Sequence, residues 1–358
     1  MRVFRTHAAL GLRPLTAPVM LFIPLGVLLG QNVLGIISAN ALAHLDIVIS
    51  VGLATLGVFI GIAAGREGKQ PTRLLAASTI EAGITIAVVS AALLVLLGIW
   101  SMPIELPMLV VALALGVCAS ASAAPSVEAG DAAVRIVAAR VADLDDVMPI
   151  LLGGFVLSLA GDRTESPFAA TALTVGVGLA TGLCGWLLVE RSEGAERGVF
   201  VLGALALLAG APAYLGLSPL LGGMAAGFFW VIAPGQCDVI IARELRKVQH
   251  PLIVLLLIIA GARLLPSLAG VWLFAPYVVF RFAGKVLGGW TASRLAPGVA
   301  PSDLGAYLIP PGVIGIAFAL NLHQVAGAAA APLVFAATAG AIACEALAIA
   351  VAPAVDRA

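Results

Sequence analysis

The chain alternates long apolar runs with short polar gaps. A helix that spans the ~30 Å hydrocarbon core of a bilayer needs about 20 residues, at a rise of about 1.5 Å per residue. The pattern predicts twelve such helices, at residues 17–37, 46–64, 73–99, 107–125, 134–161, 167–190, 198–212, 217–234, 250–265, 268–293, 302–321 and 329–353. The sequence therefore predicts an all-α polytopic membrane protein.

The composition favours the same class. Of the 358 residues, 61% are hydrophobic and only 11% are charged, whereas a soluble domain of this length covers its surface with charge. The 40 glycines suit closely packed helices in lipid. The net charge of zero gives no indication of nucleic-acid binding, and the four scattered cysteines indicate neither a disulfide framework nor a metal site. We expect no cofactor.

The positions of Lys and Arg orient the predicted helices, because these residues concentrate in cytoplasmic loops. If the N-terminus is inside, fifteen of the 19 Lys and Arg residues fall on the inner side. Only Arg163 and Arg263 fall on the outer side, and Arg281 and Lys285 lie within a helix. The pattern predicts a multi-pass protein of the inner (cytoplasmic) membrane with both termini in the cytoplasm.

Several charged residues fall inside the predicted helices, where an unpaired charge costs several kcal/mol and is a functional hypothesis by default. The helical rise places Asp146, Lys285, Arg281 and Glu345 about 20–25 Å from the outer face, and Glu81 about 12 Å from the inner face. The sequence thus predicts one buried ionic layer, formed by Glu81, Asp145, Asp146, Arg281, Lys285 and Glu345.

The neighbouring carboxylates Asp145 and Asp146 point in directions about 100° apart on a helix. One of them can pair with Lys285 while the other faces a hydrated cavity, where a proton and a metal cation compete for it. A purely structural role, in which paired charges pin helices together, is the alternative. We favour that alternative for the accessory charges Glu81, Arg281 and Glu345.

Two predicted helices contain residues that interrupt a helix. The 107–125 segment carries Ser120, Ser122 and Pro125, and the 302–321 segment carries Pro310, Pro311 and Gly312. Proline removes a backbone donor and disfavours helix before it, so both segments are expected to unwind. Breaks at corresponding places in two halves are typical of inverted-repeat transporters with a site near the midplane. The repeats would be the three helices from residue 73 to 161 and the last three of the chain.

Short segments along nearly the whole chain resemble the monovalent cation:proton antiporter superfamily, especially its bacterial sodium/proton branch. These segments are IPLGVLLGQNVLGII at 23–37, VGLATLGVFIGIAAG at 51–65, LDDV at 144–147, YLGLSPLLGGMAAGFFW at 214–230 and RFAGKVLGG at 281–289. The resemblance implies the sodium/proton antiporter fold, in which the two broken helices cross.

The resemblance also implies roles for individual residues. Asp146 would bind the sodium ion or the proton, Asp145 would pair with Lys285, and the broken helices would support this site. Residues 73–161 and 266–358 would form a core that moves like an elevator. Residues 1–72, which hold the dimer-forming helices, and the connecting helices of 162–265 would form the scaffold of a homodimer. The acid pair resembles electrogenic members, which exchange two protons per sodium.

The chain departs from the family pattern at both breaks. The stretch ASASAAPS at 119–126 has serine and alanine where the family usually has threonine, and Val313 stands where a polar residue is frequent. These departures leave fewer oxygen ligands and leave open whether sodium, lithium or potassium is preferred.

The sequence predicts secondary active antiport of sodium, or lithium or potassium, against protons, with a role in pH homeostasis. The partners would be membrane lipid, the cation and the proton. The alternative is a sodium-coupled symporter of a small organic anion on a related crossed-helix fold.

A channel is disfavoured because a pore does not need an acid pair with a lysine. An enzyme is disfavoured because no nucleophile–base pair is evident. His250 at the inner face is read as a plain interfacial residue, with cytoplasmic pH sensing as the alternative.

Overall fold

The computed structural model describes residues 18–67, 73–100, 104–123, 132–161, 166–296, 300–301 and 303–355. Within these residues the secondary structure is helical apart from one isolated two-residue bridge. The helices are α1 (Pro18–Leu29), α2 (Ala39–His44), α3 (Asp46–Glu67), α4 (Arg73–Ile99), α5 (Met108–Ser120), α6 (Ala132–Leu144), α7 (Val147–Ala160), α8 (Pro167–Arg191), α9 (Gly194–Tyr214), α10 (Pro219–Ile232), α11 (Cys237–Ala262), α12 (Leu268–Leu295), α13 (Leu304–Tyr307), α14 (Val313–Ala326), the 3-10 helix η2 (Gly327–Ala330) and α15 (Ala331–Val355).

Length and apolar composition identify membrane-spanning helices among these elements. Seven helical stretches of the described residues are long and apolar enough to cross a membrane, and α1, α5 and α10 are shorter apolar helices. Large apolar side chains such as Phe168, Leu202 and Leu268 are exposed on the outside of the bundle. A soluble protein would not expose so many of them, but lipid covers them readily. The chain is an all-α, multi-pass membrane protein.

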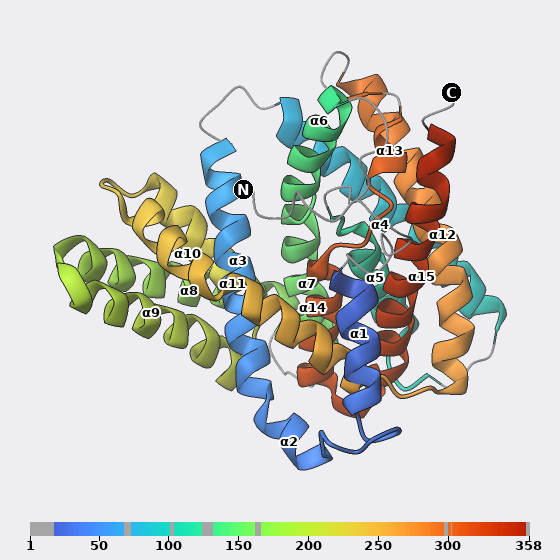
Figure 1. Ribbon diagram of the computed structural model, residues 1–358, viewed down its shortest axis with the longest axis horizontal. Helices are drawn as coiled ribbons and strands as arrows, with labels where there is room; N and C mark the ends of the chain where they lie inside the picture. Colours follow the sequence, from blue (N-terminus) through green and yellow to red (C-terminus); the bar gives the residue numbers. More distant parts are fainter. Residues whose placement is uncertain are drawn as a thin grey trace, which may run out of the picture.

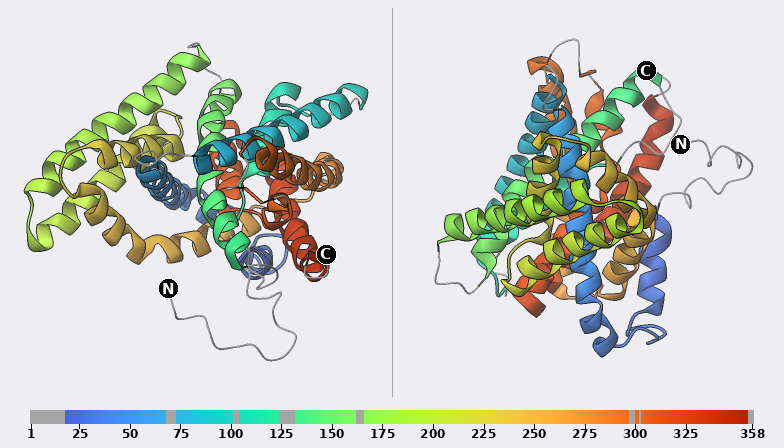
Figure 2. Two further views of the ribbon diagram at one scale, coloured as in Figure 1. Left: turned by 90° about the horizontal axis from the view of Figure 1, so that it is seen from above. Right: turned by 90° about the vertical axis from the view of Figure 1, so that its left-hand side faces the viewer.

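The helices pack in two groups (Figures 1 and 2). In one group α3 lies along α10, α10 packs on α8, and α1 packs on α11. In the other group α12 packs on α4 and α15, and α4 also packs on α5. Helices α7 and α14 lie between the groups. Helix α7 contacts α8 and α10 of the first group and α5 of the second, and α14 contacts α3 and α11 of the first group and α5 and α15 of the second.

Glycines allow the backbones of α3 and α10 to touch. A Cβ atom added at Gly57 would lie 2.1 Å from the carbonyl oxygen of Leu220, and one at Gly227 would lie 2.3 Å from that of Val58. Small residues at such positions let membrane helices associate through close van der Waals contact. These glycines make α3 and α10 a tightly joined pair.

Two predicted helices have different ends in the structure. The segment predicted at 17–37 is helical only to Leu29, and Gly35, with φ of +63°, lies in the following turn, in a conformation that favours glycine. The helix predicted at 250–265 begins at Cys237. Its first part is amphipathic, with Ile241 and Leu245 buried one turn apart while Lys247 is exposed, so a measure of hydropathy alone misses it.

The prediction of one continuous helix at 134–161 was wrong. The structure has α6 and α7 there, with Asp145 and Asp146 in a turn between them. The backbone at Asp146 stays close to helical values, with φ of −73° and ψ of −18°. The two carboxylates therefore occupy a local interruption at which the chain hardly changes its course.

The two broken helices cross, as the resemblance implies. Helix α5 ends at Ser120, and the chain between α13 and α14 is non-helical at 308–312. The unwound segments pair antiparallel at Ser122 and Pro311. The amide of Ala123 donates to the carbonyl of Pro310 (3.0 Å), and the amide of Gly312 donates to that of Ala121 (3.1 Å). Pro125 lies outside the described residues.

Candidate ion and proton site

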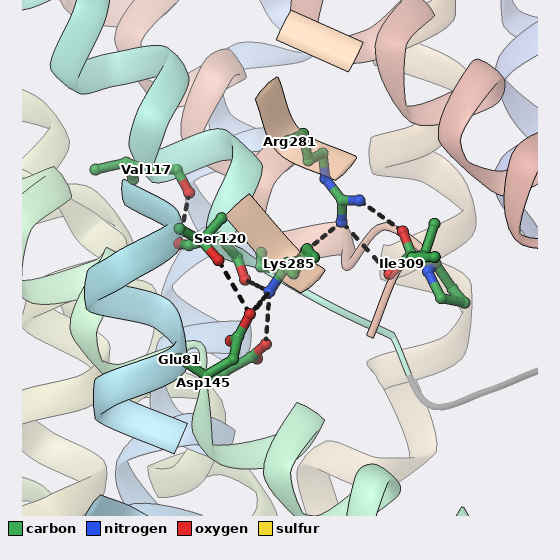
Figure 3. A network of polar contacts seen from close by, with 10 residues as sticks. Glu81, Val117, Ser120, Asp145, Arg281, Lys285 and Ile309 are labelled. Carbon is green, nitrogen blue, oxygen red and sulfur yellow. Dashed lines mark hydrogen bonds and ion pairs between the residues drawn. The ribbon is translucent and has the colours of Figure 1, made fainter. Parts of the chain in front are cut away.

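Helix α12 carries both buried cations of the predicted ionic layer. Arg281 and Lys285 are four residues apart, so they project from one face of the helix, one turn from each other. Both are fully buried. Figure 3 shows them directed toward the ends of the broken helices.

Lys285 binds two carboxylates and one carbonyl group. Its Nζ lies 3.1 Å from Glu81 Oε1 and 3.2 Å from Asp145 Oδ2, and it also donates to the carbonyl of Ser120. All three charged side chains are fully buried. Their mutual pairing offsets the large cost of removing charges from water. The structure thus contains the expected Asp145–Lys285 pair within a three-residue cluster.

Arg281 binds the backbone of both broken helices. Its guanidinium donates to the carbonyls of Ile309 (2.5 Å), Ala121 (3.0 Å) and Pro310 (3.5 Å). The last carbonyls of a helix have no partners within the helix and carry the negative end of its dipole. Arg281 therefore satisfies and neutralises carbonyls that the breaks expose. This role of Arg281 was not predicted, and sequence spacing alone gives no signal for it.

Glu81, expected only as an accessory charge, reaches Lys285 from α4. Its other contact is with Thr85, whose hydroxyl donates to Glu81 Oε1 at 3.0 Å. Sequence reasoning missed this pairing, although the shared membrane depth of the two residues was a signal for it. Glu81 Oε1 and Asp145 Oδ2 lie at nearly the same distance from Lys285 Nζ, 3.1 and 3.2 Å.

The acid pair in the α6–α7 turn has unused oxygen atoms. Asp145 is fully buried and Asp146 is 6% exposed, and within the described part of the chain Oδ1 of each lacks a hydrogen-bond partner. The hydroxyl of Ser122 lies near the Asp145 carboxylate but outside hydrogen-bonding geometry. Unpartnered buried oxygens are costly unless a proton, a water molecule or a cation completes them.

The remaining predicted residues support the cluster in different ways. The hydroxyl of Ser120 donates a hydrogen bond to the carbonyl of Val117 (3.0 Å). Pro310, Pro311 and Gly312 form the non-helical crossing segment. Glu345 is buried in α15.

The formal charges at the crossing do not balance. Among the buried charged side chains of the described residues, four carboxylates (Glu81, Asp145, Asp146 and Glu345) face two cations (Arg281 and Lys285), an excess of two. An excess negative charge out of bulk water attracts a proton or a monovalent cation. Among the described residues no group of three or more His, Cys, Asp or Glu side chains could hold a metal ion.

A cavity of about 410 Å³ lies away from this cluster, between α3, α9 and α14. Its polar lining includes Asp46, Ser50, Asn321 and Gln324, and the rest is apolar. Gln324 of α14 donates to the carbonyl of Asp46 (2.9 Å), and Asp46 also pairs with Arg263 (2.6 Å). None of the predicted site residues lines it.

Comparison with known proteins places this arrangement in a known fold. No protein-family model and no curated protein matches the sequence. The structure is similar to that of the sodium proton antiporter MjNhaP1 from Methanocaldococcus jannaschii at pH 8, with a TM-score of 0.63 and 15% sequence identity. The similarity covers 95% of this chain and 91% of that one. The chain therefore has the fold of this sodium proton antiporter, as the sequence predicted.

Proposed function

We propose that the protein is a secondary active antiporter that exchanges sodium, or lithium or potassium, for protons across the inner membrane. The observation that carries this proposal is the acid pair in the α6–α7 turn, beside Lys285 and at the crossing of the broken helices. Its excess negative charge and unpartnered oxygens suit a site that holds either a proton or a cation.

In this proposal Asp146 binds the transported species. At 6% exposed it is buried, but less completely than Asp145, which has no exposed surface. Asp145 is held by Lys285 when no cation is present. When a cation arrives, it displaces the proton of Asp146 and draws on the unpartnered oxygen of Asp145.

In this proposal the carbonyl groups at the crossing do not bind the cation. Those of Ala121, Ile309 and Pro310 already accept hydrogen bonds from Arg281, and that of Ser120 accepts one from Lys285. The cation would therefore take its oxygens from the carboxylates, from Ser122 and from water. A site with few fixed protein ligands fits an ion that must also leave quickly.

Alternating access would be an elevator movement. Residues 73–161 and 266–358 would form the moving core, and residues 1–72 and 162–265 the scaffold that dimerises. The close α3–α10 contact supports a firm scaffold, and α7 and α14 lie where the core would slide against it. Both termini would be cytoplasmic.

The test is transport by the purified chain in proteoliposomes that carry a pH-sensitive dye. Addition of sodium, lithium or potassium should release protons in the wild type and not in Asp146→Asn, while Ser90→Ala on α4 should behave as wild type. Proton release by Asp146→Asn at the wild-type rate would contradict the assignment of Asp146 as the residue that binds the transported ion. Sodium uptake without proton counterflow would instead favour symport of an organic anion.

A further inference from the structure

We propose that Glu81 is a positioning residue that acts as the permanent counter-charge of Lys285, so that Asp145 can leave the lysine when a cation arrives. This inference rests on the proposed function and deepens it. It assigns different roles to two carboxylates that contact the same ammonium group.

The geometry gives Lys285 two carboxylate partners on separate elements. Glu81 lies on α4, and Asp145 lies in the turn between α6 and α7. Their oxygens are 3.1 and 3.2 Å from Nζ, on side chains that are all fully buried. A buried ammonium that loses its only carboxylate carries a penalty of several kcal/mol. With two partners, Lys285 stays compensated when one of them turns away.

The surroundings identify Glu81 as the fixed partner. Helix α4 packs along α12, and a Cβ atom added at Gly288 of α12 would lie 2.7 Å from the carbonyl oxygen of Glu81. The two backbones are therefore in direct contact at this level. Thr85 also holds Oε1 of Glu81 by a hydrogen bond. A glutamate fixed at both its backbone and its side chain keeps its place beside the lysine.

Asp145 has fewer side-chain contacts, although its amide donates to the carbonyl of Val141 (2.8 Å). It lies between two short helices rather than inside a long one. Only its Oδ2 is used by Lys285, and its Oδ1 has no hydrogen-bond partner within the described part of the chain. Asp145 is also the carboxylate adjacent to Asp146. It is therefore the exchangeable partner of the lysine, positioned to share a cation with its neighbour.

The consequence is a prediction about cation affinity. Without Glu81, Lys285 would hold Asp145 as its sole carboxylate, and the site would lose one negative charge. Both effects oppose cation binding. We expect Glu81→Gln to raise the half-saturating sodium concentration about tenfold, which corresponds to about 1.4 kcal/mol. The maximal exchange rate should change much less, because Asp146 is unaltered.

The experiment measures sodium binding apart from transport. Melting temperatures of the purified full chain are recorded against sodium concentration for the wild type, Glu81→Gln, the double variant Glu81→Gln/Lys285→Gln and Ser90→Ala. Ser90 is a matched control because it is also buried on α4 and bonds the backbone of α5 at Ala112. The double variant should recover sodium affinity close to wild type, since it removes the charge that Glu81 compensates.

Each outcome decides the matter. Wild-type sodium affinity in Glu81→Gln, or a double variant as weak as the single one, overturns the proposal. If Glu81→Gln fails to fold and the double variant folds, the uncompensated lysine is the cause and the proposal stands. If neither folds while Ser90→Ala does, Glu81 has only a packing role and the proposal falls. A wild type that binds sodium without exchanging protons overturns the proposed function instead.

Discussion

Ser122 and Pro311 face each other in an antiparallel pair, although they belong to different halves of the chain. The pair joins the unwound parts of two broken helices, and hydrogen bonds on either side of it link the two backbones. Arg281 and Lys285 then neutralise the helix ends that the breaks expose. The crossing is thus held by backbone hydrogen bonds and by two cations from α12.

Adding a single methyl group at the crossing should destabilise the protein. A Cβ atom at Gly315 would lie 2.3 Å from the carbonyl oxygen of Cys118, and one at Gly312 would lie 2.7 Å from that of Ser122. Overpacking of this kind costs about 1–3 kcal/mol. We expect Gly315→Ala to lower the melting temperature and the folded yield, as measured by thermal unfolding and size-exclusion chromatography in detergent.

The control for that substitution is Gly98→Ala on α4, where an added Cβ would meet no atom within 4 Å. Alanine is the better helix former by about 1 kcal/mol, so this variant should be neutral or slightly more stable. Equal melting temperatures for Gly315→Ala and Gly98→Ala would contradict the close crossing.

The two neighbouring aspartates should differ in their effect on stability. Asp145→Asn removes one partner of a buried ion pair, a change that typically costs about 3–5 kcal/mol. The remaining Glu81–Lys285 contact should reduce that cost. Lys285 contacts Glu81, Asp145 and the carbonyl of Ser120 rather than Asp146. Asp146→Asn should therefore leave the melting temperature near wild type while abolishing exchange. Thermal unfolding of both variants checks this difference, and a larger loss in Asp146→Asn would contradict it.

Arg281 should require its guanidinium group and not only its charge. Three carbonyls from both broken helices surround it, and one ammonium group at this position cannot reproduce the same planar fork of donors. We expect Arg281→Lys to fold with reduced stability and slower exchange, and Arg281→Gln to be worse in both respects. Melting temperatures and proteoliposome assays measure the order. Wild-type behaviour in Arg281→Gln would show that the helix ends need no cation.

The orientation of the chain can be tested with reporters. The distribution of Lys and Arg predicts that both termini are cytoplasmic. A reporter that is active only in the cytoplasm should therefore work when fused at either end. It should fail when inserted near Leu265, in the loop after α11, which the same distribution predicts to lie outside. Activity at one terminus alone would mean an odd number of crossings.

The sequence predicted the fold well because its strongest signals are those that a bilayer imposes. Apolar runs of spanning length gave the helices, and paired prolines gave the break before α14. The start of α11 was missed because its first turns are amphipathic, as the buried Leu245 and the exposed Lys247 show. The turn at Asp145 and Asp146 was missed because its backbone stays nearly helical.

The site was only partly predictable. The resemblance suggested the Asp145–Lys285 pair, and the structure contains it. The contacts of Arg281 depend on where two separate backbones cross, and the contact of Glu81 depends on how α4 lies against α12. Such relations come from tertiary packing, which a single sequence does not encode in its local pattern.

The pairing of Ser122 with Pro311 depends on main-chain atoms, and a fold built on such contacts can be kept while the amino-acid sequence changes. Main-chain atoms are common to every amino acid, so a junction made from them tolerates exchange of the side chains attached to it. Ser122 and its alanine neighbours can therefore be exchanged for other residues without loss of the junction. A similar fold at 15% sequence identity is consistent with a junction of this kind.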